Sequence, residues 1–237
     1  MKTNTVMLYS GGLDSLCAAQ LCKPDVKLYI ACGSKYEEQE IARLPKDVTV
    51  LTGVLNLARW EREDFIIPNR NTLLVTLATM YGDEILLCAV DGDRSCDKDS
   101  VFSALAGSLL RHTWQAQHWT PMRTIHVSLP VALYTKTALL RRAIAAGLSH
   151  KDVLHSWSCY EHGAEPCGTC KPCVRKYIAL VANHVQVPKT YYKRSPYEAE
   201  WLPQVLADID SGKRWRCPAE DSEFAMVFGA SVRGAMR

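Results

Sequence analysis

Six residues near the N-terminus, Ser-Gly-Gly-Leu-Asp-Ser at 10–15, have the types and order needed to hold an anion such as phosphate. They follow an apolar run at 5–9 and precede a segment with helical spacing, so we expect a turn between a buried strand and a helix. In a parallel α/β sheet, ligands bind outside the carboxyl ends of the strands. Glycines let the backbone approach a ligand closely, and the start of a helix attracts an anion. We therefore interpret residues 10–15 as an anion-binding turn.

The carboxylate inside this turn needs a separate explanation. Ser10 and Ser15 add hydroxyl donors, but Asp14 repels a phosphate unless a cation lies between them, which favours Mg²⁺ at Asp14. The alternative is an ordinary helix start, because serine and aspartate are common N-cap residues and Gly-Gly is a common turn. The turn differs from the P-loop of NTPases, which requires Gly-Lys-Ser/Thr after a longer loop.

Four cysteines near residue 160 are spaced to bind one metal ion, in the pattern C-x7-C-x2-C-x2-C. Four thiolates within fifteen residues match the tetrahedral coordination of zinc in a closed structural site. An iron–sulfur cluster also uses four cysteines, and a redox-active CxxC pair is a third interpretation. Lys171, Arg175 and Lys176 are expected to offset the negative charge of a zinc ion held by four thiolates. We expect zinc, with the ligands Cys159, Cys167, Cys170 and Cys173.

The composition is typical of a globular cytoplasmic protein. The 237 residues are 48% hydrophobic and 22% charged, which excludes a disordered or fibrous chain. We expect no membrane partner, because no apolar run is long enough to span a bilayer and no secretory signal is present. In a reducing compartment, ten cysteines indicate metal ligands or buried thiols rather than disulfides. The net charge of +3 is too small to indicate a nucleic-acid partner.

Apolar runs alternate with helical patterns over the first 150 residues. This alternation predicts the α/β class, a parallel twisted sheet flanked by helices with right-handed crossovers. We divide the chain into an α/β domain at 1–150, a cysteine segment with its helix at 151–188 and an appendage at 189–237. The expected strands are 5–9, 27–32, 48–51, 84–90 and 124–129. The expected helices are 13–22, 36–44, 72–81, 101–117, 135–146 and 174–184.

The turn at 10–15 resembles the SGGxDS loop of the PP-loop ATP pyrophosphatases, which hold the pyrophosphate of ATP. Together with the cysteine pattern, it resembles the 7-cyano-7-deazaguanine synthase family. Ile-Pro-Asn-Arg-Asn at 67–71 is similar to that family's V-P-G-R-N segment, and 91–99 takes the place of its acidic, substrate-facing loop. Thr-Lys at 135–136 stands at the family's Asp-Lys, and Ser-Cys-Tyr at 158–160 resembles its T-C-Y.

This resemblance covers about residues 5–185 and implies an ATP-dependent carbon–nitrogen ligase with a Rossmann-like nucleotide-binding domain. In that family the carboxylate of 7-carboxy-7-deazaguanine is adenylated and ammonia displaces AMP to give an amide. A second adenylation, on the amide oxygen, then leads to the nitrile. Each adenylation places charge on a leaving pyrophosphate, which positioned cations and N–H groups stabilise. The resemblance implies ATP, Mg²⁺ and Zn²⁺ as cofactors, and we expect a homodimer.

The resemblance also implies roles for individual residues. Arg70 would pair with a phosphate or carboxylate, or would only make an ordinary salt bridge at a helix start. Lys136 would contact phosphate or would only begin a helix. Asp93 and Asp97 would accept the amino and ring N–H groups of the deazaguanine, or would lie in a solvated acidic loop. The expected catalytic residues are Asp14, Arg70 and Lys136, and the expected nucleotide-binding residues are Ser10, Gly11, Gly12, Leu13, Asp14 and Ser15.

Several positions depart from the family pattern and leave the acceptor open. Ala-Cys-Gly-Ser at 31–34 replaces a polar Asp-Tyr-Gly-Gln run, Asn69 replaces a glycine, and Lys176 stands where arginine is usual. A divergent relative would stop at the amide or would join the deazaguanine to another amine.

Two other functions are alternatives. A PP-loop enzyme of the RNA-thiolation type also combines such a turn with cysteine pairs, and the aromatic and basic stretch at 189–194 would then bind RNA. Eight basic against seven acidic residues from 189 onward disfavour RNA. A zinc-stabilised binding module without catalysis is the non-enzyme alternative, which the complete turn at 10–15 disfavours.

Overall fold

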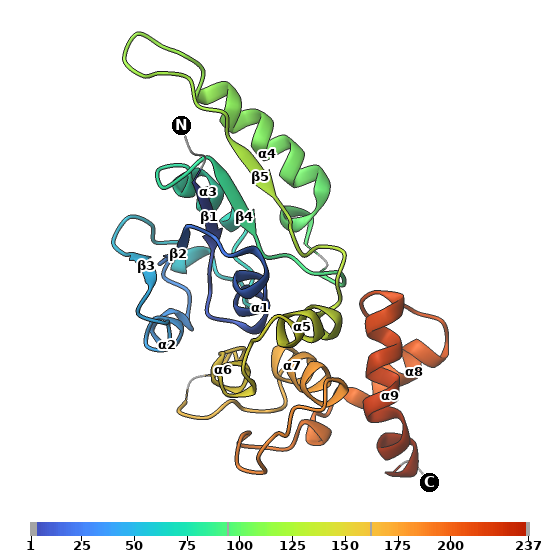
Figure 1. Cartoon of the computed structure of the whole chain (residues 1–237). Helices are drawn as coiled ribbons and strands as arrows, with labels where there is room; N and C mark the ends of the chain where they lie inside the picture. The colour runs from blue at the N-terminus through green and yellow to red at the C-terminus, as the bar shows by residue number, and fades with distance from the viewer. Residues whose placement is uncertain (1–3, 94, 162, 236–237) are drawn as a thin grey trace.

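A five-stranded parallel sheet lies at the centre of the molecule (Figure 1). The computed structural model describes residues 4–93, 95–161 and 163–235. The strand order is β3-β2-β1-β4-β5, and Val6 is level with Val26 and Ile85 on the two neighbouring strands. The α/β class expected from the sequence is confirmed. The strands are β1 (Thr5–Leu8), β2 (Val26–Ile30), β3 (Val48–Leu51), β4 (Glu84–Leu87) and β5 (His126–Ser128).

Helices cover both faces of this sheet. One face is covered by α1, α5 and α7, and the other is covered by α3 and α4. The helices of the described residues are α1 (Leu13–Cys22), α2 (Glu37–Ile41), α3 (Arg70–Ala78), α4 (Ser100–Thr113), α5 (Lys136–Ala145), α6 (His150–His155), α7 (Lys171–Ala182), α8 (Leu202–Asp210) and α9 (Pro218–Ala235).

The apolar strands explain why both faces are buried. Met7 of β1 packs into the core beneath α1 and α5, whereas Val6 and Leu8 pack into the core beneath α3 and α4. Successive residues of a strand point to opposite faces, so a continuously apolar strand supplies both layers. Because the strands are parallel, the loops that leave their carboxyl ends meet at one edge of the sheet.

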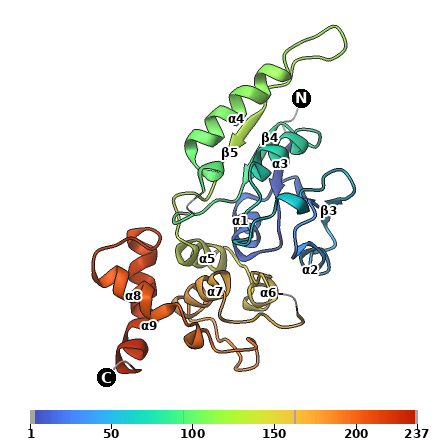
Figure 2. The ribbon, with the colours of Figure 1, turned by 180° about the vertical axis from the view of Figure 1, so that it is seen from behind.

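The last two helices pack on α7 rather than on the sheet. Val174 and Ile178 of α7 share an apolar core with Leu202 of α8 and with Phe224 and Phe228 of α9. Figure 2 shows α8 and α9 beside α5 and α7 and far from β2 and β3. We call α8, α9 and their connection the C-terminal unit.

The chain beyond residue 149 is more helical than the sequence indicates. Helix α6 begins at His150 after the N-cap Ser149, whose hydroxyl accepts the Asp152 amide, and its six residues are too few to show a helical period. Helix α7 begins at Lys171 rather than at 174. The C-terminal unit escapes prediction because Pro203 and Pro218 look like helix breakers, yet both lie in first turns, where proline is favoured. The division of the chain at 150 and 188 stays a prediction.

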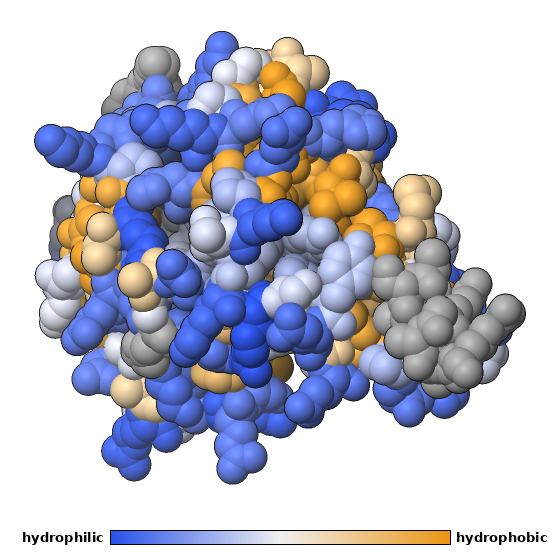
Figure 3. All heavy atoms as spheres, turned by 90° about the horizontal axis from the view of Figure 1, so that it is seen from below, coloured by the Kyte–Doolittle hydropathy of each residue, from blue (hydrophilic) through white to orange (hydrophobic). Residues whose placement is uncertain are grey.

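The outer surface is mainly polar on the face that Figure 3 displays, with smaller apolar areas between the polar side chains. Among the described helices, none has both the length and the apolar character needed to cross a membrane. Helix α4 carries an apolar stripe, because Val101, Leu105 and Leu109 are 62%, 66% and 56% exposed. Residues four apart lie on one side of a helix, so these three side chains form a continuous surface.

Gly168, between two of the clustered cysteines, lies in a turn that packs closely against Arg194. Its φ is +87°, and a Cβ there would lie 1.9 Å from the Arg194 carbonyl oxygen. Gly212 has a similar φ of +82° but open space around it. We expect Gly168→Ala to lower the free energy of unfolding by at least about 3 kcal/mol, and Gly212→Ala by about 1 kcal/mol, in urea titrations. Equal losses would show that the approach to Arg194 does not shape this turn.

Candidate active site

The anion-binding turn leaves the carboxyl end of β1 and enters α1, as the sequence predicts. Gly11 has a φ of +73°, a conformation that favours glycine. The Ser15 hydroxyl donates to the Gly12 carbonyl at 3.1 Å, and the Gly12 amide donates to the Ser10 hydroxyl at 3.3 Å. Helix α1 begins at Leu13, so its first N–H groups lack acceptors within the helix. These groups can bind an anion.

Residues near the start of the cysteine segment contact the anion-binding turn and fix its backbone. The Trp157 amide donates to the Gly11 carbonyl at 3.1 Å, and the Arg43 guanidinium lies 3.9 Å from the centre of the Trp157 ring. Trp157 is buried, and Lys176 of α7 donates to the carbonyl of the preceding residue, Ser156. The conformation of the turn therefore depends on residues far along the chain.

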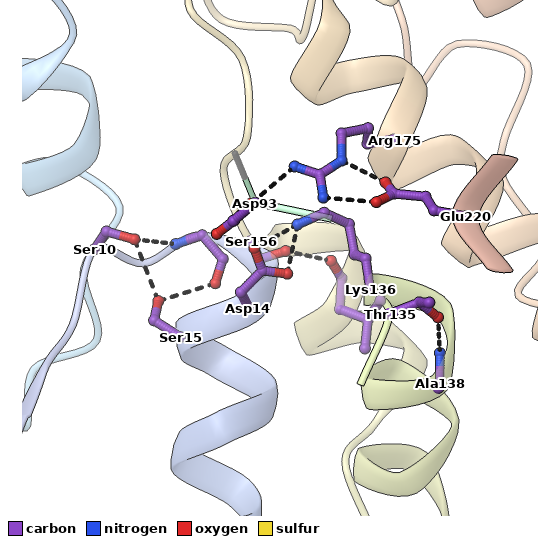
Figure 4. A network of polar contacts seen from close by, with 12 residues as sticks. Ser10, Asp14, Ser15, Asp93, Thr135, Lys136, Ala138, Ser156, Arg175 and Glu220 are labelled. Carbon is purple, nitrogen blue, oxygen red and sulfur yellow. Dashed lines mark hydrogen bonds and ion pairs between the residues drawn. The ribbon is translucent and has the colours of Figure 1, made fainter. Parts of the chain in front are cut away.

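Asp14 and Lys136 face each other across the site (Figure 4). Lys136 is the first residue of α5, and its ammonium donates to both oxygens of the Asp14 carboxylate in the first turn of α1. Thr135 caps α5 by accepting the Ala138 amide at 3.1 Å, which fixes the start of this helix. Two of the expected catalytic residues thus lie together, with an ammonium group beside the carboxylate for which we predict Mg²⁺.

Asp93 belongs to a second group of charges beside this pair. Arg175 of α7 donates through Nη1 to Asp93 at 3.2 Å, and through Nε and Nη2 to Glu220 of α9 at 2.5 and 3.0 Å. The Lys98 ammonium lies 3.7 Å from the other Asp93 oxygen. Burial acts to raise the pKa of Asp93, but the charges of Lys98 and Arg175 outweigh it and lower that pKa to about 2. Asp93 is therefore an ionised acceptor at neutral pH.

Three other residues from the sequence analysis lie at the start of α3 and in the acidic loop. Arg70 begins α3 and donates to the Tyr36 hydroxyl at 2.9 Å, so its partner is a tyrosine rather than the carboxylate of an ordinary salt bridge. Asn71 is buried, and its amide donates to the Asp97 carbonyl at 3.3 Å. The Asp97 carboxylate accepts the hydroxyl of Ser95 in its own loop. The expected role of Asp97 in substrate binding stays a prediction.

Stacked aromatic rings join this region to the cysteine segment. The Tyr160 ring stacks on Tyr36 with centroids 5.5 Å apart and on Phe65 with centroids 4.8 Å apart. Tyr160 directly follows Cys159, so the position of the cysteine cluster is tied to the residue that holds Arg70.

The four clustered cysteines converge, as their spacing predicts, with sulfur atoms that all lie within 4.8 Å of one another. The main-chain amides of Glu161 and Cys167 donate to Cys159 Sγ at 3.3 Å, and the Cys170 amide donates to Cys167 Sγ at 3.3 Å. Hydrogen bonds from Cys170 and Cys173 lower the pKa of Cys159, and a metal binds cysteine as the thiolate. The donor set fits one tetrahedral metal ion.

Arg175 and Glu220 are site residues that the motifs do not identify. The sequence predicts that Arg175 offsets the charge of a zinc centre, but in the structure it joins two carboxylates. Its position two residues after the last cysteine was the only sequence feature that marked Arg175 as a candidate. Glu220 lies outside every motif, so no spacing in the sequence could identify it.

Lys176, expected to offset the same charge, instead supports the chain next to the turn. It is 2% exposed, and its ammonium donates to the carbonyls of Leu154 and Ser156 and to the Tyr191 hydroxyl. Lys176→Met should lower the free energy of unfolding by about 3 kcal/mol, because these buried acceptors lose their donor. Lys171→Met, at an exposed position of the same helix, is the control for urea unfolding. Equal midpoints for the two variants would contradict this role.

Comparison with known proteins agrees with the motifs. The family model for the queuosine biosynthesis protein QueC matches residues 55–184. The 7-cyano-7-deazaguanine synthase of Hahella chejuensis is 24% identical over 220 residues, which cover 81% of this chain and 94% of that protein. In Colwellia psychrerythraea, 7-cyano-7-deazaguanine synthase 1 is 22% identical and covers 81% of this chain and 100% of its own length.

A second protein of Colwellia psychrerythraea, 7-cyano-7-deazaguanine synthase 2, is 27% identical over 126 residues. That match spans 53% of this chain and 56% of the relative. No solved structure matches the chain. The family model extends over more than half of the 237 residues. The chain therefore belongs to the QueC family of queuosine biosynthesis proteins.

Proposed function

We propose that this protein converts 7-carboxy-7-deazaguanine and ammonia to 7-cyano-7-deazaguanine at the expense of ATP, through adenylated carboxylate and amide intermediates. One observation carries the proposal: the anion-binding turn, Lys136 and the ionised Asp93 meet at one edge of the sheet in a chain of the QueC family. The synthases to which the chain is similar support this acceptor.

ATP binding would exchange the partners of the Asp14–Lys136 pair. A Mg²⁺ ion held by Asp14 would neutralise charge on the triphosphate. Lys136, released from Asp14, would turn its ammonium to the phosphates and stabilise the leaving pyrophosphate. The backbone of Gly11, Gly12 and Leu13 and the hydroxyls of Ser10 and Ser15 would hold the same group, since they form the turn at the start of α1.

The acceptor would lie beside Asp93, next to the Asp14–Lys136 pair. Asp93 would accept the amino and ring N–H groups of the deazaguanine, and Asp97 would do so only after leaving the Ser95 hydroxyl. Arg70, held by Tyr36, would pair with a phosphate or with the acceptor carboxylate.

The cysteine cluster would bind structural Zn²⁺. Four convergent thiols leave no open coordination position, so the ion would stabilise the fold rather than activate a substrate. The domain division at 150 and 188 is part of the proposal. The metal would connect α7, which follows the cysteines, to the anion-binding turn, because Trp157, close to the first cysteine, is hydrogen-bonded to that turn.

The experiment is a product assay. The purified protein is incubated with ATP, Mg²⁺, 7-carboxy-7-deazaguanine and ammonium, and the products are identified by mass spectrometry. We expect AMP, pyrophosphate and the nitrile. Accumulation of the amide alone would assign a divergent enzyme that stops at the first step. A failure to release AMP with this acceptor would refute the proposal.

An RNA substrate is disfavoured by the packing of the stretch at 189–194. Tyr192 is buried beside the cysteine cluster, and the Tyr191 hydroxyl donates to the Leu154 carbonyl at 2.6 Å. The Lys193 and Arg194 amides bond to the cysteine segment. The Tyr192 ring is therefore not presented to bases, and the hydroxyl of the half-buried Tyr191 is engaged within the protein.

We propose that the protein acts as a cytoplasmic homodimer. The exposed stripe of Val101, Leu105 and Leu109 supports a contact between two copies of the chain, because covering an apolar helix face of this kind is energetically favourable. Light scattering coupled to gel filtration would give twice the chain mass for a dimer, and a monomer at micromolar concentration would contradict it.

A further inference from the structure

The C-terminal unit inserts a buried carboxylate into the wall of the site. Glu220, in the first turn of α9, is 2% exposed and accepts hydrogen bonds from two nitrogens of Arg175. Those nitrogens lie on one edge of the guanidinium, and only Nη1 contacts Asp93. Figure 4 shows Glu220 and Asp93 on different sides of Arg175.

Two loops of the site are shaped around this helix. Gly92 has a φ of +89°, which favours glycine, and a Cβ there would lie 2.2 Å from a carboxylate oxygen of Glu220, so a larger residue next to Asp93 would displace that carboxylate. The Thr135 hydroxyl, beside Lys136, donates to Glu223 of α9 at 3.0 Å. Helix α9 therefore touches the loop that carries Asp93 and the helix start that carries Lys136.

We propose that Glu220 is a positioning residue that keeps Asp93 available to the acceptor. By holding Nε and Nη2 on one edge of the guanidinium, Glu220 fixes the orientation of Arg175, and in this orientation Nη1 alone contacts Asp93 instead of a bidentate pair. Asp93 thereby retains lone pairs for the N–H groups of a planar guanine-like ring. This inference rests on the proposed function, because it takes the deazaguanine as the ligand of Asp93.

The test compares Glu220→Gln with the wild type in the product assay. Glutamine keeps the size of the side chain but not its charge, so Arg175 turns toward Asp93 and the acceptor loses its partner. We expect KM for 7-carboxy-7-deazaguanine to rise about tenfold, with kcat and KM for ATP within about twofold. Glu220→Asp should recover part of the loss. Asp208→Asn, which breaks an exposed ion pair with Lys213 in the same unit, is the matched control.

A direct measurement separates this inference from the proposed function. Calorimetry gives the affinity of each variant for 7-carboxy-7-deazaguanine without turnover. If the wild type binds the acceptor but releases no AMP, the proposed function fails and the Glu220 comparison still stands. Equal acceptor affinities for the wild type and Glu220→Gln would overturn the inference. So would a loss shared equally by ATP, acceptor and thermal stability, which indicates a merely structural role.

Arg175→Lys supplies the same test if Glu220→Gln does not fold. Lysine keeps the positive charge but cannot hold two carboxylates in a fixed fork. We expect the same selective rise in KM for the acceptor, and an unchanged KM would overturn the inference. Hydrogen exchange gives an activity-independent readout: the Asp93 amide, which bonds to Val90 at 3.1 Å, should exchange faster in either variant.

Discussion

Asp14→Asn is expected to lower the rate of AMP release by at least about 10³-fold, equivalent to about 4 kcal/mol of lost transition-state stabilisation. Asparagine keeps the shape of the side chain but cannot bring negative charge to a metal ion on the triphosphate. It also leaves Lys136, which is 8% exposed, without its carboxylate partner. The measurement is AMP release at saturating ATP and acceptor, with circular dichroism and metal content recorded in parallel.

The matched control is Asp47→Asn. Asp47 precedes β3 at the opposite edge of the sheet and pairs with Lys27 at the surface. This variant should retain wild-type turnover within about twofold, because exposed ion pairs contribute little. Activity of Asp14→Asn comparable to that of the control would show that the carboxylate has no part in the reaction.

Cys173→Ser should lose the bound metal and at least about 5 kcal/mol of stability. A serine hydroxyl does not replace a thiolate as a zinc ligand, and the three remaining cysteines hold the ion weakly. Cys173 lies at the start of α7, which also carries Arg175 and Lys176, so release of the metal should loosen both contacts. Metal analysis and thermal unfolding measure the two effects.

Cys96→Ser is the control for this substitution, because Cys96 is exposed and lies outside the cluster. It should keep about one zinc ion per chain and an unchanged melting temperature. Chelation of the wild type should reproduce the instability of Cys173→Ser. Iron in place of zinc would contradict the metal assignment, and a stable metal-free protein would contradict its structural role.

The α/β core could be predicted because its signals are local. Apolar strands such as β1 and β4 are short and continuous, and Gly-Gly after β1 marks a turn whatever lies elsewhere in the chain. The cysteine spacing is equally local, so the convergence of the four cysteines could be predicted. The predicted helix boundaries differ from the observed ones where a capping residue sets the end. Helix α5, predicted from 135, begins at Lys136 because Thr135 is its N-cap.

The charged wall of the site could not be predicted because it is assembled over long separations. Arg175 meets a carboxylate 82 positions earlier and another 45 positions later. No periodic pattern encodes such a meeting, which depends on how α9 packs against α7. The acidic loop showed the same limit: its composition could not distinguish Asp93, held by Arg175, from Asp97, which accepts a serine hydroxyl beside it.

The absence of a side chain at Gly92 has an evolutionary consequence. Because the carboxylate at 220 lies where a methyl group at 92 would be, and residue 92 has a φ of +89°, a side chain at 92 would be strained and would displace that carboxylate. Homologues in which residue 92 is alanine or larger should carry a shorter or uncharged residue at 220, or should lack the helix that bears it. A lineage in which residue 92 gained a side chain before residue 220 became smaller would have passed through a crowded intermediate, so we expect the exchange at 220 to come first.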